Sequence, residues 1–173
     1  MPYAHRKMNL HRDREERRHR TAPVSYCIKL GFFAGLLWGG FRWVLYTIHF
    51  TKTIPAFLVD PFFRIAFLKT GWGHVIGICS FIVFSMVAAL IYYYVLGRIA
   101  GPWPGLFYGA FWWCVWFLTA GPLLAMVEPV YKIGYNTIST ELSVFLIWGL
   151  FIGYTIAFEF NDETSREPVK LFE

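Results

Sequence analysis

The amino-acid sequence predicts an all-α integral membrane protein with four transmembrane helices, and three observations support this fold class. Hydrophobic residues make up 57% of the 173-residue chain and charged residues only 16%, whereas a soluble domain usually carries about 25% charged residues. Four apolar stretches are each close to the roughly 20 helical residues that cross a bilayer. Basic residues gather before the first of these stretches, as is typical of the cytoplasmic side of membrane proteins.

Residues 1–24 form a basic tail that we expect on the cytoplasmic side. Its candidates for contacts with lipid head groups are Arg12, Arg14, Arg17, Arg18 and Arg20. A charge run of this kind usually fixes topology and stays in water. The sharper hypothesis is binding of anionic lipid head groups, at about 1 kcal/mol per basic residue near the surface. Vesicle binding that did not weaken with salt would exclude it. We expect no nucleic-acid binding, because no suitable fold or aromatic pattern accompanies the charge.

The first predicted span covers residues 25–49 and carries a stripe of small residues. Gly31, Gly35 and Gly39 recur at every fourth position, so they share one face of a helix where a neighbouring backbone can approach closely. Arg42 follows three residues after Gly39 and falls on the same face. We expect this face to point at protein, because a charge at that depth is costly in lipid.

A short interfacial helix is predicted at about residues 60–69, between the first two spans. This stretch is apolar but too short to cross the bilayer, and it contains Arg64. Asp60 followed by Pro61 is typical of an N-cap and a first helical position. The alternative is a re-entrant hairpin.

The second and third spans are predicted at residues 73–96 and 105–127. Gly73 and Gly77 give the second span a small-residue pair of the same spacing. The third span is rich in aromatic residues and contains Pro122, where we expect a kink or local unwinding. The connector between the two spans is short and rich in Gly and Pro, as is typical of a turn between antiparallel helices.

The fourth span is predicted at residues 141–160, followed by a polar cytoplasmic tail at 161–173. Gly149, Gly153 and Ala157 form a further stripe of small residues at every fourth position. Each stripe is a weak signal by itself. Together they predict close helix packing, either within one chain or between copies.

The distribution of basic residues predicts that both termini face the cytoplasm of a bacterial cell. With this orientation the cytoplasmic side carries eleven basic residues: Arg6, Lys7, Arg12, Arg14, Arg17, Arg18, Arg20, Lys29, Arg98, Arg166 and Lys170. The outer side carries four: Lys52, Arg64, Lys69 and Lys132. Because an excess of Lys and Arg marks the cytoplasmic segments, we expect a multi-pass protein of the cytoplasmic membrane.

Arg42 is the strongest candidate for a functional residue, and two interpretations of it remain open. It lies within the outer half of the first span, where an unpaired arginine would cost several kcal/mol. The acids at that depth are Glu128 and Glu141, with Asp60 as a third candidate. An ion pair with Glu128 or Glu141 would orient the bundle, and we favour this structural role because one arginine with one acid makes no relay.

The functional alternative is a site that handles an anion or a proton. It would use Arg42 with Glu128, near the expected kink, and with His49 and His74. This interpretation requires a polar cavity that reaches Arg42, and a dry interior filled with side chains would count against it.

We expect neither an enzyme nor a bound cofactor or metal. The sequence contains no GxGxxG or Walker loop and no HExxH or CxxC pair. Cys27, Cys79 and Cys114 lie in or beside apolar stretches without metal-ligand spacing, so we interpret them as small packing residues.

The chain resembles the YqhR family of conserved membrane proteins from Bacillus-type Firmicutes. The resemblance is carried by GFFAGLLWGGFRWVLYTIHFT, FLVDPFFRIAFLKTGWGH, GPWPGLFYGAFWW and TAGPLLAMVEP. It covers nearly the whole chain, and Arg42, Asp60-Pro61, the run from Gly101 to Gly105, and Glu128-Pro129 are its distinctive positions. It implies a small polytopic protein of the cytoplasmic membrane and assigns no catalytic or ligand-binding residue.

Three functional hypotheses follow. The first is a non-enzymatic membrane component that packs with itself or with another membrane protein through its small-residue stripes. The second is a small transporter or permeation subunit that uses Arg42 and Glu128. The third is a protein that binds anionic lipids through its basic tail.

Overall fold

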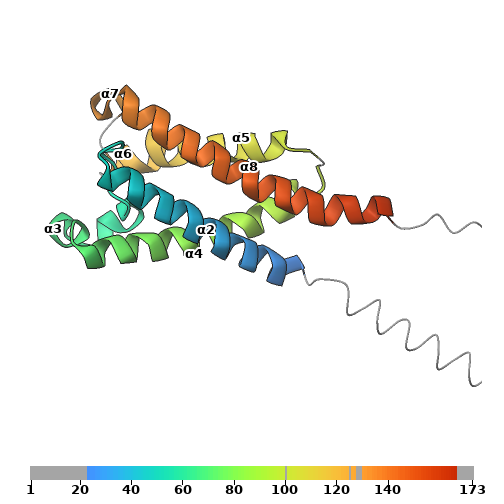
Figure 1. Cartoon of the computed structure of the whole chain (residues 1–173). Helices are drawn as coiled ribbons and strands as arrows, with labels where there is room; N and C mark the ends of the chain where they lie inside the picture. The colour runs from blue at the N-terminus through green and yellow to red at the C-terminus, as the bar shows by residue number, and fades with distance from the viewer. Residues whose placement is uncertain (1–22, 100, 125, 128–129, 167–173) are drawn as a thin grey trace, which may run out of the picture.

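Four long helices, arranged as two packed pairs, form the body of the molecule (Figure 1). The computed structural model describes residues 23–99, 101–124, 126–127 and 130–166. Within these residues, four helices are long and apolar enough to cross a membrane: Pro23–Thr47, Gly71–Leu96, Trp103–Leu123 and Tyr135–Phe160. The predicted all-α fold class with four candidate spans is therefore confirmed.

The first pair consists of α2 (Pro23–Thr47) and α4 (Gly71–Leu96), which pack along most of their lengths. The stripe of small residues on α2 makes this packing possible. A methyl group on Gly31 would lie 2.5 Å from the Cα atom of Met86, and one on Gly35 would lie 2.5 Å from that of Ile82. The obstacle is backbone in both cases, so this stripe belongs to an interface within the chain.

The second pair consists of α5 (Trp103–Cys114) and α8 (Tyr135–Arg166), where glycines face one another. A methyl group on Gly149 would lie 2.5 Å from the backbone of Gly109, and one on Gly153 would meet the Cα atom of Gly105. The two backbones therefore approach as closely as small-xxx-small packing allows. Ala157 is also buried on α8.

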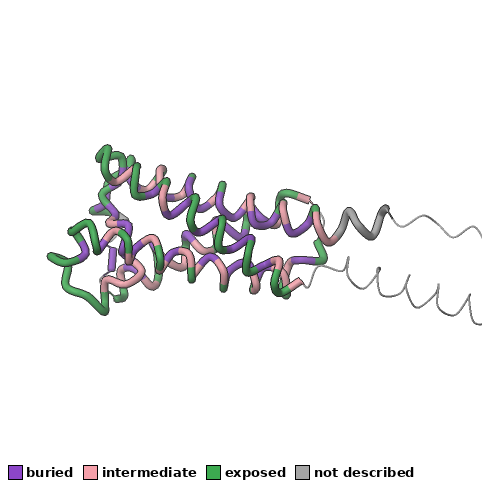
Figure 2. The backbone as a smooth tube through the Cα atoms, turned by 60° about the horizontal axis from the view of Figure 1, so that its bottom comes forward, coloured by how far each residue is buried: buried purple, intermediate pink, exposed green. Residues whose placement is uncertain are grey.

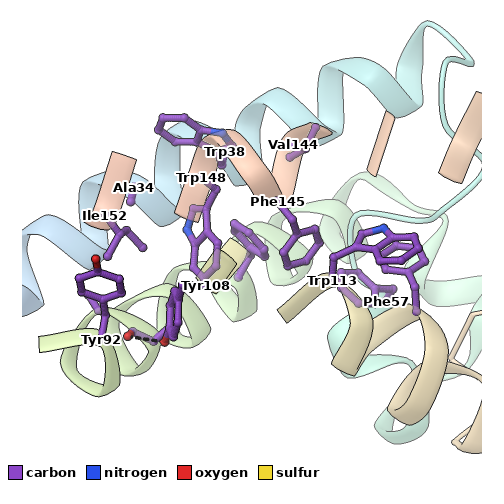
Figure 3. Packing of buried hydrophobic residues seen from close by; sticks show 14 of the residues in the cluster. Ala34, Trp38, Phe57, Tyr92, Tyr108, Trp113, Val144, Phe145, Trp148 and Ile152 are labelled. Atoms are coloured by element: carbon purple, nitrogen blue, oxygen red, sulfur yellow. Dashed lines mark hydrogen bonds between the residues drawn. The ribbon is translucent and has the colours of Figure 1, made fainter. Parts of the chain in front are cut away.

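Aromatic side chains fill the space between the two pairs. The ring of Trp148 on α8 stacks on Phe84 of α4, with ring centroids 5.5 Å apart and planes 22° apart. Its indole N–H donates to the hydroxyl of Ser85 at 3.0 Å, and the hydroxyl of Tyr108 on α5 donates to the carbonyl of Ala88 at 2.7 Å. Figure 3 shows Trp148 and Tyr108 between the helices, and Figure 2 shows buried and exposed residues alternating along each long helix. The two pairs thus share one aromatic core.

The third span changes its helical geometry where the sequence predicts a kink. A π-helix, η2 (Val115–Ala120), follows α5 and leads into the short α6 (Gly121–Leu123). The N–H of Gly121 donates to the carbonyl of Trp116, five residues back. Pro122 is the physical reason, because its ring cannot donate a hydrogen bond and clashes with the carbonyl four residues earlier.

The first helix ends two residues before the predicted limit, at a left-handed residue. His49 has φ of 60°, and the N–H groups of His49 and Phe50 donate to the carbonyls of Tyr46 and Leu45. This pair of bonds is a Schellman motif, which usually places glycine at the left-handed position. Histidine is among the residues that tolerate it, so His49 terminates the helix.

The connector between the first two spans departs from the expected single helix at 60–69. It contains a 3₁₀-helix, η1 (Phe57–Phe62), and a separate single turn, α3 (Ile65–Leu68). Asp60 lies inside η1 and Arg64 occupies the N-cap of α3, so the prediction of Asp60 as an N-cap is wrong. Burial explains the early start: Phe57 is 2% exposed, which draws the chain into helical geometry before Asp60 is reached.

The last long helix begins at Tyr135, ahead of the predicted start at residue 141. It follows a short helix, α7 (Val130–Ile133), and a left-handed glycine, Gly134, with φ of 92°. Figure 1 shows α3, α6 and α7 at one end of the bundle, while α2 begins and α8 ends at the other. The described ends of the chain therefore lie on the same side, as an even number of antiparallel spans requires.

Candidate functional site

An ion pair between Arg42 and Glu141 is the centre of the candidate site. Arg42 lies on α2 and Glu141 on α8, so the pair joins the two helix pairs. The Nη2 atom of Arg42 lies 3.0 Å from Oε2 of Glu141, and the two side chains are 3% and 1% exposed. A buried charge is tolerated only when it is paired, so each residue explains the presence of the other.

Aromatic rings surround the guanidinium group of Arg42. Its Cζ atom lies 4.4 Å from the ring centroid of Phe57, 5.6 Å from that of Phe81 and 5.8 Å from that of Phe145. A desolvated arginine over an aromatic face is stabilised by the ring quadrupole, by about 2 kcal/mol in favourable cases. The rings therefore compensate part of the cost of removing the charge from water.

Arg42 retains unused hydrogen-bonding capacity. Its Nε and Nη1 atoms are buried and have no hydrogen-bond partner among the described residues. The contact of Nη2 with Glu141 is short but not aligned as a hydrogen bond. The pair is therefore held by charge attraction and by the rings more than by directed hydrogen bonds.

Glu141 is held from a second side by the segment that follows α2. The hydroxyl of Thr51 donates to Oε1 of Glu141 at 2.8 Å, and the backbone N–H of Thr53 donates to the oxygen of Thr51 at 3.2 Å. Both threonines are buried. Each oxygen of the carboxylate therefore has its own partner.

Residues 50–53, which we call the strap, run across the first turns of α8. The backbone N–H of Lys52 donates to the hydroxyl of Thr137 at 3.3 Å, and the side-chain amide of Asn136 donates to the carbonyl of Phe50 at 3.0 Å. These bonds explain why α8 begins before residue 141. Its first turns are polar in sequence, but their side chains have partners in the strap.

The structure brings together only some of the residues that the sequence singled out. Arg42 meets Glu141, whereas Glu128 and the five tail arginines lie outside the described residues. Asp60 belongs to η1, where partial burial raises the pKa of its carboxyl above the usual value. The ring of His74 packs against Tyr46 with centroids 5.5 Å apart.

Sequence reasoning missed the polar partners Thr51, Asn136 and Thr137. A signal for one of them was present, because Thr137 and Glu141 are four residues apart and share a helix face. It could be used only if the helix was known to begin before residue 141. The strap has no sequence signature of its own.

The fold and the ion pair define a class of protein, a polytopic, all-helical membrane protein. Glycine contacts, an aromatic core and the buried pair of Arg42 and Glu141 hold its long helices together. The family described as conserved membrane protein YqhR matches residues 7–170. The chain therefore belongs to the YqhR family, which confirms the resemblance seen in the sequence.

A bacterial relative supports this assignment. The chain is 34% identical over 148 residues to a protein of Bacillus subtilis (strain 168) named uncharacterized protein YqhR. The match covers 84% of this chain and 83% of the relative. No solved structure matches the chain. The family description establishes a membrane protein and names no reaction, substrate or partner.

Proposed function

We propose that the protein is a non-enzymatic component of the bacterial cytoplasmic membrane that acts by binding another membrane protein or a second copy of itself. Both termini face the cytoplasm in this proposal. The excess of basic residues on the side of the termini supports the orientation.

One observation decides where such a partner would bind: the chain uses its small-residue stripes and its aromatic interior for its own packing. Gly35 faces α4 and Gly149 faces α5 at distances that leave no space for another helix. A partner therefore meets the bilayer-facing surface rather than the stripes themselves. The stripes contribute indirectly, because they hold the helices in the arrangement that presents this surface.

A transporter that uses Arg42 is the second candidate. The unpartnered Nε and Nη1 atoms of Arg42 favour it. The filled aromatic core around Trp148 and Phe145 counts against it, because both side chains are almost completely buried between the helices. Glu128, the acid that the sequence suggested for such a site, lies outside the described residues. The binding role is therefore the better supported of the two.

Photocrosslinking in native membranes tests the proposal. A photoreactive amino acid is placed at one exposed position on each long helix: Phe33, Val83, Phe107 or Tyr154, which are 62%, 56%, 69% and 55% exposed. We expect a discrete protein adduct from positions on one face and lipid adducts from the others. Ala89, which is fully buried against the chain's own helices, serves as the control that should give no intermolecular adduct. Lipid adducts alone from all four positions, together with a monomeric mass, would contradict the proposal.

A further inference from the structure

A groove open to the bilayer runs along the contact between α2 and α8. It consists of two hollows of about 340 and 400 Å³, and Ile147 of α8 lines both. The first hollow is lined by bulky apolar side chains that include Trp38 and Phe151. The second lies closer to the strap, with Phe41 and Leu45 among its lining residues. Both hollows are mostly apolar, and Ile147 lies on the border of each.

The second hollow has polar groups at the end that lies next to the strap. Ser139, Thr140 and Ser143 of α8 line it together with Asn136. The hydroxyl of Ser143 donates to the carbonyl of Ser139. Ser139 and Thr140 make no side-chain hydrogen bond to another described residue. Hydroxyl groups at the mouth of an apolar groove suit a ligand with a polar head and an apolar body.

Lys52 adds a positive charge beside this mouth. Its backbone is bonded to Thr137, which is adjacent to Asn136 of the lining, and its residue is exposed. It makes no ion pair with another described residue. The ammonium group of a lysine at this point can bind a phosphate group, because it acts as a positive point charge.

The position of Tyr135 at the start of α8 indicates that the polar mouth lies at the depth of the lipid head groups. Tyr135 is 90% exposed and precedes Ser139 by one helical turn, and exposed tyrosines are typical of the membrane interface. At 1.5 Å per residue, Ser143 lies about 12 Å and Ile147 about 18 Å along the axis from Tyr135. Ser139 and Thr140, about one helical turn from Tyr135, therefore fall near the head groups, whereas Ser143 and Ile147 fall within the hydrocarbon.

We propose that this groove binds one phospholipid molecule. An acyl chain lies along the hollows lined by Ile147, and the phosphate group is bound by Lys52 and the hydroxyl groups of Ser139 and Thr140. This site is on the outer side of the membrane in the orientation proposed above, and it is independent of the basic tail and of any protein partner.

The lining favours a lipid chain over a transmembrane helix. The closest approach of a second helix is made at small residues, as Gly35 and Gly149 show within this chain. The groove instead presents Phe41, Leu45 and Ile147, which keep another backbone at a distance. A flexible hydrocarbon chain fills such a surface without needing a flat contact.

Native mass spectrometry of the purified full-length protein tests the proposal. The delipidated protein is exchanged with phosphatidylglycerol or with diacylglycerol that carries the same acyl chains. We expect one retained phosphatidylglycerol per protein and no retained diacylglycerol, because only the former has a phosphate for Lys52. Equal retention of both lipids, or retention of neither, would overturn the proposal.

Matched variants locate the bound lipid. Lys52→Ala should reduce retention of phosphatidylglycerol by about fivefold, the factor expected for the loss of one basic residue near a phosphate. Lys69→Ala, at an exposed lysine at the same end of the bundle, is its control. Ile147→Trp should reduce retention by at least the same factor, whereas Val83→Trp, at a similarly exposed position on α4, should not.

The thermal unfolding midpoint shows that each variant is folded, and Ile147→Phe replaces Ile147→Trp if the larger side chain lowers it. Unchanged retention in the Ile147 variant, or a dimer that forms in place of the lipid complex, would overturn the proposal.

Discussion

At the residue scale, Arg42 and Glu141 show how a membrane protein retains a charge pair in its interior. The pair is almost fully buried, and the carboxylate also accepts a hydrogen bond from Thr51. Removal of one partner from such a pair leaves an uncompensated charge, whereas removal of both leaves none. The pair should therefore behave as one unit in mutagenesis.

We expect Arg42→Met or Glu141→Leu to lower the free energy of unfolding by about 3 to 5 kcal/mol each. The double variant should lose much less than the sum of the two changes, because the remaining side chains are apolar and of suitable size. Thermal or denaturant-induced unfolding in detergent measures all three variants. A double variant whose loss equals the sum would show that the two residues are not coupled.

At the scale of single elements, the glycines of α2 have different roles according to the face on which they lie. Gly35 contacts the backbone of Ile82 on α4, whereas no atom outside its own helix lies within 4 Å of where a side chain on Gly40 would begin. The same substitution at these two positions therefore separates helix packing from helix propensity.

Gly35→Ala should lower the free energy of unfolding by about 1 to 3 kcal/mol, since the added methyl group meets backbone that must move. Gly40→Ala should leave it unchanged or raise it by up to about 1 kcal/mol, since alanine is the better helix former. Unfolding in the same detergent compares the two variants. Equal effects would refute the assignment of Gly35 to the contact with α4.

The strap shows how tertiary contacts set the limits of an element. Polar residues at 135–140 indicate a loop, and the sequence places the start of the last span after them. In the structure Asn136 and Thr137 make hydrogen bonds to the strap, and Glu141 accepts a hydrogen bond from Thr51 and forms an ion pair with Arg42. These partners lie about 90 positions earlier in the chain, so no local pattern could reveal them.

At the scale of the whole molecule, the four spans place the described ends of the chain together (Figure 1). The strap, η1 and α7 lie at the opposite end, and the connector between α4 and α5 lies on the side of the termini. Any orientation in the membrane must therefore place Lys52 and Arg98 on opposite sides.

Cysteine labelling in intact cells tests the orientation proposed here. A membrane-impermeant maleimide should label Lys52→Cys in intact cells, and should label Arg98→Cys only after the membrane is permeabilised. The wild-type chain is the background control, because Cys27 is buried and Cys79 and Cys114 lie within the candidate spans Gly71–Leu96 and Trp103–Leu123, away from the water that carries the reagent. The reverse pattern would place the termini outside.

The sequence by itself determined the class of the protein and the approximate places of its spans. The length and apolar character of each stretch depend on local composition, and the bilayer imposes helices on such stretches because their backbone groups need internal partners. The family resemblance and the change in helical geometry near Pro122 also follow from local residues.

Only the tertiary structure decided which helices pair and which acid meets Arg42. The stripes of small residues permit close approach of another helix. They do not determine which helix packs there, since every such stripe offers the same kind of surface. Glu141 meets Arg42 because the contact of α5 with α8, the aromatic core around Trp148 and the strap together bring its turn of α8 against α2. That arrangement depends on contacts between distant parts of the chain, and these exist only once all four helices have packed.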